Sequence, residues 1–214
     1  NPLSPIVPTK LHIPYQTQEI ISRERLEEKL DRSAGHVLTL VTAPSGYGKS
    51  TLVAGWVRRR GVKAAWLSID ESDNDLIRFW HGLIASLQFI EEGFAEHILR
   101  EIHAVRHFPI EYSVAQLAEL LHRRERQTVI VLDDYHAVTN KAVHDSLALF
   151  VQSLQADAPQ VRLILISRSL PPFPVSRLRV KDQLVEFTTQ DLQFQYEEIE
   201  RLLNGAMQPG LRPP

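Results

Sequence analysis

A short glycine-containing loop that follows an apolar run constrains this chain more than any other feature. Residues 37–41 read VLTLV, residues 43–51 read APSGYGKST, and the apolar segment LVAGWV comes next. The first run has the length and composition of a buried strand, and residues 49–60, followed by Gly61, have the pattern of a helix. The sequence therefore predicts a strand, a tight loop and a helix in direct succession.

This loop contains the residue types that bind phosphate. Backbone N–H groups in a turn that Gly46 and Gly48 permit can surround phosphate oxygens, and the start of the following helix adds positive potential. Lys49 is predicted to reach the β- and γ-phosphates, and Ser50 to offer its hydroxyl to Mg²⁺. The alternative is an ordinary turn in which GKS occurs by chance. The predicted nucleotide-binding loop comprises Ala43, Pro44, Ser45, Gly46, Tyr47, Gly48, Lys49, Ser50 and Thr51.

Ala43 stands where the Gly-x-x-x-x-Gly-Lys-Ser/Thr pattern has its first glycine. The residue leaves the predicted strand, where a methyl group is tolerated as long as φ is negative. We therefore expect the loop to bind phosphate despite this departure from the pattern.

A second apolar run ends in two carboxylates. Residues 128–134 read TVIVLDD, so Asp133 and Asp134 lie at the carboxyl end of a buried strand, where open α/β sheets bind ligands. Asp133 is predicted to hold Mg²⁺ directly or through water, and Asp134 to orient or polarise an attacking water. The alternative for Asp134 is that it caps the following turn.

A third apolar run, LILISR at 163–168, ends in Arg168. An arginine at this strand end can contact a γ-phosphate or respond to its loss. The alternative is an ordinary surface arginine. The predicted catalytic residues are accordingly Asp134, Lys49 and Arg168.

Strand and helix patterns alternate along the chain. Apolar strands without alternation are covered on both faces, so we expect a three-layer α/β/α P-loop NTPase fold with a mainly parallel five-stranded sheet. Trp66 and Trp80 are expected in the core. The predicted strands are 37–41, 63–69, 128–134, 161–167 and 184–187. The predicted helices are 20–30, 49–60, 76–89, 113–126, 141–155 and 191–203.

The predicted organisation has four parts. An extended N-terminal segment at 1–19 precedes the NTPase core at 20–188. The start of a helical lid at 189–208 and a loose tail at 209–214 follow. The proline-rich ends favour a chain that continues into a longer protein.

Composition narrows the function classes. The chain has no cysteine, which excludes disulfide scaffolds and thiolate zinc sites. It has 24 basic and 26 acidic residues and a formal charge of −2, so its overall charge does not favour general binding of nucleic acid. The basic runs at 58–60 and 123–126 are expected to be solvated helix ends. No apolar stretch approaches the roughly 20 residues that span a bilayer. We expect a soluble, cytoplasmic protein that does not bind membranes.

Together these motifs resemble the nucleotide-binding domain of the STAND class of signal-transduction ATPases, in its MalT-like branch of large LuxR-type transcriptional regulators. The matching segments extend over nearly the whole chain and occur in the same order as in the family. The matching segments are PTKLHIP at 8–14, IISRERLEEKL at 20–30, VTAPSGYGKSTLVAGW at 41–56, AWLSIDESDND at 65–75, VIVLDDYH at 129–136, LILISR at 163–168 and DLQFQYEEI at 191–199.

The resemblance implies further properties of the site. Arg23 matches an arginine near the nucleotide, although Ser22 replaces the glycine that usually precedes it. His136 fits the pattern after the acidic pair, where a packing or hydrogen-bonding role is an equal alternative. The acidic strand is expected not to adjoin the strand before the phosphate loop. ATP is expected rather than GTP.

The resemblance also implies how such a module works. ATP with Mg²⁺ favours an active, self-associating state, ADP favours a resting state, and slow hydrolysis resets the switch. A small-molecule or protein inducer and DNA would act through domains beyond Pro214. Two other classes stay open: a turnover P-loop ATPase or kinase unrelated to transcription, and an interaction scaffold that is indifferent to nucleotide.

Overall fold

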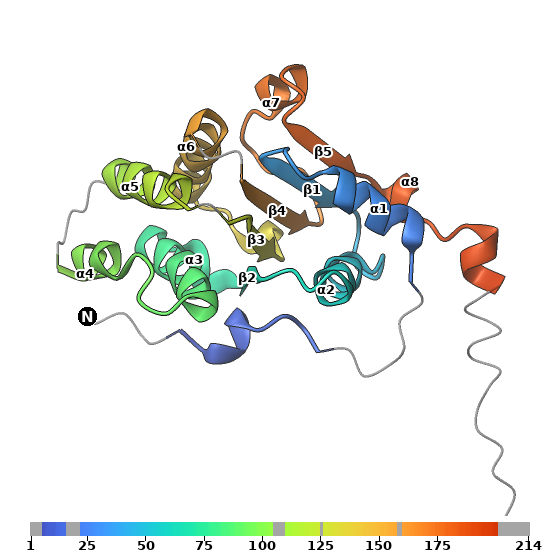
Figure 1. Ribbon diagram of the computed structural model, residues 1–214, viewed down its shortest axis with the longest axis horizontal. Helices are drawn as coiled ribbons and strands as arrows, with labels where there is room; N and C mark the ends of the chain where they lie inside the picture. The colour runs from blue at the N-terminus through green and yellow to red at the C-terminus, as the bar shows by residue number, and fades with distance from the viewer. Residues whose placement is uncertain (1–5, 16–21, 105–109, 125, 158–159, 201–214) are drawn as a thin grey trace, which may run out of the picture.

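The computed structural model describes residues 6–15, 22–104, 110–124, 126–157 and 160–200 (Figure 1). Its centre is a five-stranded sheet in the order β2-β3-β4-β1-β5. Every neighbouring pair is parallel, which confirms the predicted α/β fold and parallel sheet. β4 lies between β1 and β3, so the expected separation of the acidic strand from the loop strand is also confirmed. The strands are β1 Leu38–Thr42, β2 Ala64–Ser68, β3 Thr128–Asp133, β4 Val161–Ser167 and β5 Leu184–Phe187.

Helices cover both faces of this sheet. Alternate strand residues point to opposite faces. Leu40 and Leu67 pack in the core on the face covered by α3 Leu76–Ile90, α4 Glu96–Ala104, α5 Ile110–His122 and α6 Lys141–Asp157. Figure 1 shows these four helices on the same side of the sheet. Val41 and Trp66 face the other way, toward α1 Glu24–Arg32 and α2 Lys49–Arg59. Trp66 and Trp80 are fully buried, which confirms their predicted place in the core.

Several predicted boundaries shift. The first helix begins at Glu24, after the non-helical Ser22 and Arg23, and residues 20–21 lie outside the described part. β3 ends at Asp133, one residue early, because Asp134 adopts a left-handed backbone. α5 spans Ile110–His122, so the basic run 123–126 follows the helix instead of ending it.

Two short helices were not predicted. α4 is nine residues long and contributes Ile98 and Ile102, one helical turn apart, to the core. α7 Ser176–Val180 precedes β5 and buries only Leu178. Segments this short carry little periodicity, and tertiary packing stabilises them more than their own propensity does.

The predicted final helix at 191–203 is not continuous. α8 Thr189–Leu192 begins earlier, at a capping box formed by Thr188 and Asp191, and Gln193 is extended with φ −64° and ψ 139°. Helical structure resumes at 196–200, where the Glu198 carboxylate accepts from the Gln195 N–H at 3.0 Å. Two local caps therefore divide the predicted helix. Residues 201–214, with the remainder of the predicted lid and the tail, lie outside the described part.

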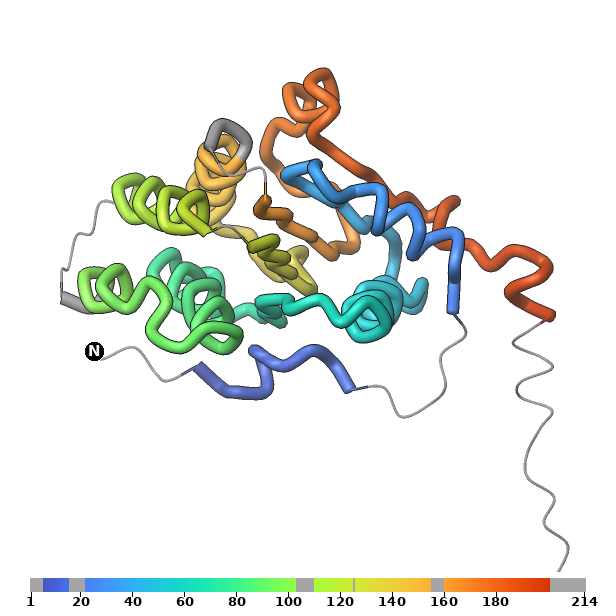
Figure 2. Tube along the Cα trace, viewed as in Figure 1, coloured from blue at the N-terminus to red at the C-terminus, as the bar shows by residue number. Residues whose placement is uncertain are grey.

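The N-terminal segment that was expected to be extended contains a 3-10 turn, η1 Pro8–Leu11. Figure 2 shows residues 6–15 running beside α3 and β2. The Lys10 ammonium fixes this segment, since Nζ lies 2.6 Å from Asp73 Oδ2 and 3.0 Å from Asp70 Oδ2.

Within the described ranges no helix combines the length and apolar character needed to cross a bilayer.

Candidate phosphate-binding site

The glycine loop joins β1 directly to α2, as predicted. Gly46 and Gly48 have φ values of 85° and 71°, in the left-handed region that glycine occupies without a steric penalty. Ala43 is not among the described residues with positive φ, and its methyl group is 1 % exposed, in the core beneath α1 and α2. The expectation that a methyl group is tolerated at Ala43 is therefore confirmed: the alanine packs as part of the core, and the two later glycines make the turn.

Lys49 begins α2 and turns back over the loop. Its Nζ donates to the Pro44 carbonyl at 2.9 Å. Burial lowers the pKa of Lys49, the charges of Asp134 and Asp133 raise it, and the charge of Arg168 lowers it. Asp133, Asp134 and Arg168 therefore all lie within electrostatic range of Lys49.

Ser50 and Asp133 meet across the site. The Ser50 hydroxyl donates to Asp133 Oδ1 at 2.7 Å. Asp133 is 4 % exposed, and burial raises its pKa to about 6 despite the hydrogen bond from Ser50, with a further rise from the charge of Asp134. The two oxygens predicted to bind Mg²⁺ are therefore in contact, and Asp133 lies where its negative charge is poorly solvated.

Asp134 follows in an unusual backbone conformation. Its φ of 58° and ψ of 35° place it at the start of η3 Tyr135–Ala137, where its side chain makes no capping hydrogen bond. The alternative of a side-chain cap is therefore wrong. Its side chain is 56 % exposed and Oδ1 lies 3.7 Å from His136 Nδ1. The structure thus presents one buried and one accessible carboxylate side by side.

Arg168 follows β4, whose Ser167 pairs with Thr42 at the end of β1. The side chain is exposed, and its charge acts on both Lys49 and His136. Burial lowers the pKa of His136, the Arg168 charge lowers it further, and Asp134 opposes the shift. Arg168 and His136 are therefore both at the site; the sequence had left the role of His136 open.

Arg23 contacts the segment that follows α8. Its guanidinium is buried and donates to the Leu192 carbonyl at 3.0 Å and to the Gln193 carbonyl at 2.9 Å. It also pairs with Glu198 at 3.0 Å and lies 4.4 Å from the centre of the Phe194 ring. These contacts join Arg23 to the C-terminal segment, an arrangement that sequence reasoning missed.

Arg59, the last residue of α2, and Arg60, which follows it, hold α1 in place. Arg59 forms an ion pair with the buried carboxylate of Glu27, and Arg60 pairs with Asp31 at 2.7 Å. The run at 58–60 is therefore more than the solvated helix end that was expected, because it fastens α1 to the helix that starts at the phosphate loop.

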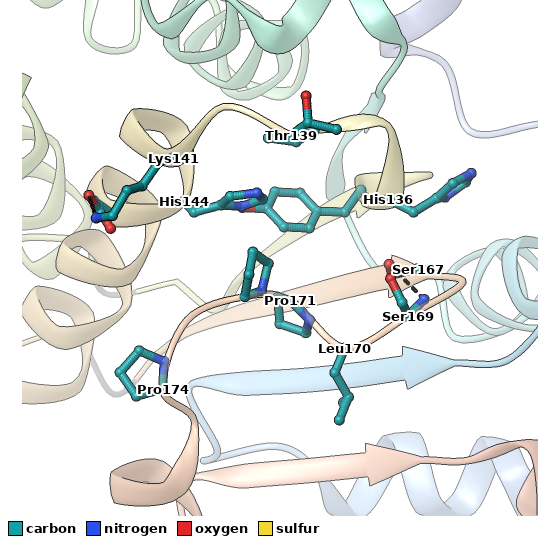
Figure 3. A pocket seen from close by; sticks show the side chains of 13 residues that line it. His136, Thr139, Lys141, His144, Ser167, Ser169, Leu170, Pro171 and Pro174 are labelled. Carbon is teal, nitrogen blue, oxygen red and sulfur yellow. Dashed lines mark hydrogen bonds and ion pairs between the residues drawn. The ribbon is translucent and has the colours of Figure 1, made fainter.

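A cavity of about 780 Å³ borders the site between two loops. In Figure 3, His144 lies on one wall and Pro171 on the other. Tyr135 and His136 of η3 contribute to the cavity, as do residues 169–172 after Arg168. One wall thus follows directly on Asp134 and the other on Arg168.

A phosphate loop between β1 and α2, with an acidic residue on β3 in contact with the first helical serine, defines a P-loop NTPase. Two solved structures share the fold. Cdc6p from Pyrobaculum aerophilum is 17 % identical with a TM-score of 0.54 over 89 % of this chain and 51 % of that chain. Orc1 from Aeropyrum pernix, solved in complex with DNA, is 19 % identical with a TM-score of 0.51 over 94 % and 53 %.

At the sequence level the chain is homologous to HTH-type transcriptional regulators named MalT, which confirms the predicted resemblance. It is 38 % identical over 201 residues to the protein of Serratia proteamaculans and 35 % identical over 199 residues to that of Yersinia enterocolitica. Each match covers 93 % of this chain but 22 % of the relative, so the chain spans about a fifth of their length. No protein-family model matches the chain.

Proposed function

We propose that this chain is the ATP-binding and ATP-hydrolysing switch module of a MalT-like, LuxR-type transcriptional regulator. Its ATP or ADP state would control self-association and activation. The observation that carries the proposal is the 2.7 Å contact between Ser50 and Asp133 beside Lys49. If the GKS sequence occurred by chance, we would not expect its serine on α2 to contact the carboxylate at the end of β3.

Binding is assigned to the loop at 43–51. Its N–H groups and the start of α2 favour phosphate oxygens, and Lys49 adds a positive charge. The donors present fit Mg²⁺, which takes one or two protein oxygens and completes its shell with phosphate and water. Ser50 and Asp133 would hold the ion, whose charge would offset that of the phosphates. Adenine specificity is proposed from the likeness to MalT regulators.

Slow hydrolysis is assigned to the accessible carboxylate. Asp134 would accept a hydrogen bond from the attacking water and orient it, since its side chain makes no cap and is 56 % exposed. Arg168 would contact the γ-phosphate and detect its loss. The resemblance implies that Arg23 lies near the nucleotide, so its contacts with Leu192, Gln193 and Glu198 would connect the nucleotide to the C-terminal segment.

A switch requires contacts that differ between its two states. In this proposal Asp134 and Arg168 would both respond to the γ-phosphate, and each directly precedes residues that line the 780 Å³ cavity. The γ-phosphate can thereby bias the two loops together. The partners proposed are nucleotide, a second copy of the protein in the ATP state, and an inducer and DNA through other domains. The proposed location is the cytoplasm.

Two other functions compete with this proposal. A turnover ATPase or kinase would sustain many cycles in the isolated chain. A passive scaffold would respond equally to ATP and ADP. The retained Lys49, Ser50, Asp133 and Asp134 favour a working nucleotide site over the scaffold.

Hydrogen–deuterium exchange with a non-hydrolysable ATP analogue and with ADP, each with Mg²⁺, tests the proposal. Both nucleotides should protect 43–51, and only the analogue should protect the segments around Asp134 and Arg168. Sedimentation velocity should show larger species with the analogue. Identical protection by both nucleotides would contradict a switch, and no protection of the loop would contradict nucleotide binding.

A further inference from the structure

Asn74 is bonded to the segment that follows the acidic pair. It closes η2 Glu71–Asn74, and its Oδ1 accepts from the Thr139 N–H at 2.6 Å and from the Asn140 N–H at 3.1 Å. Its Nδ2 donates to the Ala137 carbonyl at 3.0 Å. The Thr139 hydroxyl also donates to Oδ1, and Asn140 Nδ2 donates to the Asn74 carbonyl at 2.7 Å. The Asn74 side chain thus hydrogen-bonds polar groups of a segment more than 60 positions away in the chain.

The bonds continue from this segment to Asp134. The Ala137 N–H donates to the Asp134 carbonyl at 3.0 Å, and the Val138 N–H donates to the Tyr135 carbonyl at 3.0 Å. Two hydrogen bonds to the backbone of Ala137 therefore connect Asn74 with Asp134. On the other side of the turn, the Tyr135 hydroxyl and His144 Nδ1 lie 2.7 Å apart.

Asp134 needs such support because of its backbone. A non-glycine residue with φ of 58° is in a sparsely populated region and persists where the surrounding structure holds it. This conformation turns the chain sharply after β3, so that Asp133 stays buried while Asp134 is exposed. A looser turn would let the Asp134 carboxylate move relative to the loop.

The residue that supplies the support is itself fixed. Asp73, next to Asn74, is 3 % exposed and accepts from the Lys10 ammonium at 2.6 Å and from the Asp70 N–H at 2.9 Å. The Ile69 N–H donates to the Asp133 carbonyl at 2.9 Å, which ties the start of this segment to β3. η2 is thus a rigid support for the turn that carries Asp134.

We propose that Asn74 is a positioning residue for hydrolysis: by holding residues 137–140 it sets the turn that aims Asp134 at the attacking water. The inference rests on the proposed function, because it concerns the same carboxylate. Asn74 touches neither nucleotide nor water in this role and acts through Ala137. It should therefore affect the chemical step far more than nucleotide binding.

Two substitutions at this position separate anchoring from folding. Asn74→Ala removes every side-chain bond. Asn74→Asp keeps the oxygen that accepts from Thr139 and Asn140 but loses the donor to Ala137, which is the link toward Asp134. Ser72→Ala is the matched control, since Ser72 lies in the same turn and its hydrogen bonds within the described residues are to Lys10 and Asp70.

Single-turnover hydrolysis and Mg·ATP affinity are measured for each variant, alone and combined with Asp134→Asn. Both Asn74 variants should hydrolyse between about tenfold and a hundredfold more slowly, with affinity changed less than twofold, and Ser72→Ala should match the wild type. Combined with Asp134→Asn, they should add no further slowing. Unchanged rates in a folded variant, or effects that multiply with Asp134→Asn, would overturn the proposal. If Asn74→Ala fails to fold, Asn74→Asp alone decides.

Amide exchange of Ala137 supplies a readout without nucleotide. Both Asn74 variants should exchange this amide at least about tenfold faster than the wild type, and Ser72→Ala should not. If the wild type hydrolyses no ATP, the proposed hydrolysis is contradicted. The Ala137 exchange rates would still test whether Asn74 holds this turn. An unchanged Ala137 exchange rate in both variants would overturn Asn74 as the support of this turn.

Discussion

Ser50 and Asp133 are 83 positions apart in the chain, and a hydrogen bond of 2.7 Å joins their side chains. One residue lies in the first turn of α2 and the other at the end of β3, two strands away from β1. Within the described structure this contact closes the side of the phosphate loop where a cation would lie. It makes the pair the first target for testing the metal assignment.

Ser50→Ala should weaken ATP binding mainly when Mg²⁺ is present. The substitution removes the hydroxyl that would bind the ion, while Lys49 and the loop N–H groups remain. We expect about a tenfold loss with Mg²⁺ and little loss in EDTA, measured by calorimetric titration. Ser153→Ala on α6 is the control. Equal losses in both conditions would remove Ser50 from the metal site.

Asp134→Asn should spare nucleotide binding and slow single-turnover hydrolysis. An amide keeps the size of the side chain but is a far poorer base, and removing a general base typically costs at least about a hundredfold. Quenched-flow or slow manual sampling of labelled ATP gives the rate. Asp182→Asn, whose side chain is 97 % exposed, is the control. A rate equal to that of the wild type would take Asp134 out of the mechanism.

Arg168→Ala should weaken ATP binding more than ADP binding. The exposed guanidinium is proposed to contact only the γ-phosphate, so its removal leaves the ADP contacts intact. Titrations with both nucleotides, with the exposed Arg177→Ala as control, give the ratio of the two losses. If ATP and ADP affinities fall by the same factor, Arg168 is no γ-phosphate sensor.

Arg23 and Glu198 should stabilise the protein as a pair. Both side chains are buried, at 7 % and 9 % exposure, and removing one partner of such a pair costs about 3 kcal/mol because the other charge is left uncompensated. Urea unfolding of Arg23→Ala, Glu198→Ala and the double variant should give losses that do not add. Additive losses would show that the contact contributes nothing of its own.

The same pair predicts a pH dependence. Burial raises the pKa of Glu198, but hydrogen bonds from Arg23 and the Gln195 N–H, with the Arg23 charge, bring it below its ordinary value of 4.5. A lowered pKa in the folded state means that the stabilisation is complete above pH 4.5 and is lost as the pH falls through the folded value. The coupling should therefore be equal at pH 7 and pH 5.5 and decline only in stronger acid. A decline between pH 7 and pH 5.5 would contradict this.

The phosphate loop and the strand ends could be predicted because their signals are local. Residues 43–51 form a continuous motif, and Asp133 and Arg168 each follow an apolar run whose end the sequence marks. In a parallel sheet all such ends meet at one edge, so local signals were enough to bring them together.

The partners of Arg23 and Asn74 could not be predicted in this way. Arg23 is bonded to residues about 170 positions away, and Asn74 to a loop about 65 positions away. Neither contact leaves a periodic pattern, since each depends on how separate elements pack. The Asp75 side chain next to Asn74 caps α3, but nothing local showed that Asn74 bonds to residues 137–140.

Titration of the nucleotide-stripped protein with Mg·ATP, comparing Lys49→Ala with Lys63→Ala, tests the central claim most directly. Lys49 is proposed to make a charged contact worth about 1.5 to 3 kcal/mol, so its loss should weaken binding about tenfold or more. Lys63 is exposed at the start of β2, the opposite end from the loop, and its substitution should change nothing. Equal affinity for Mg·ATP in the wild type and a folded Lys49→Ala variant would contradict the phosphate-binding site.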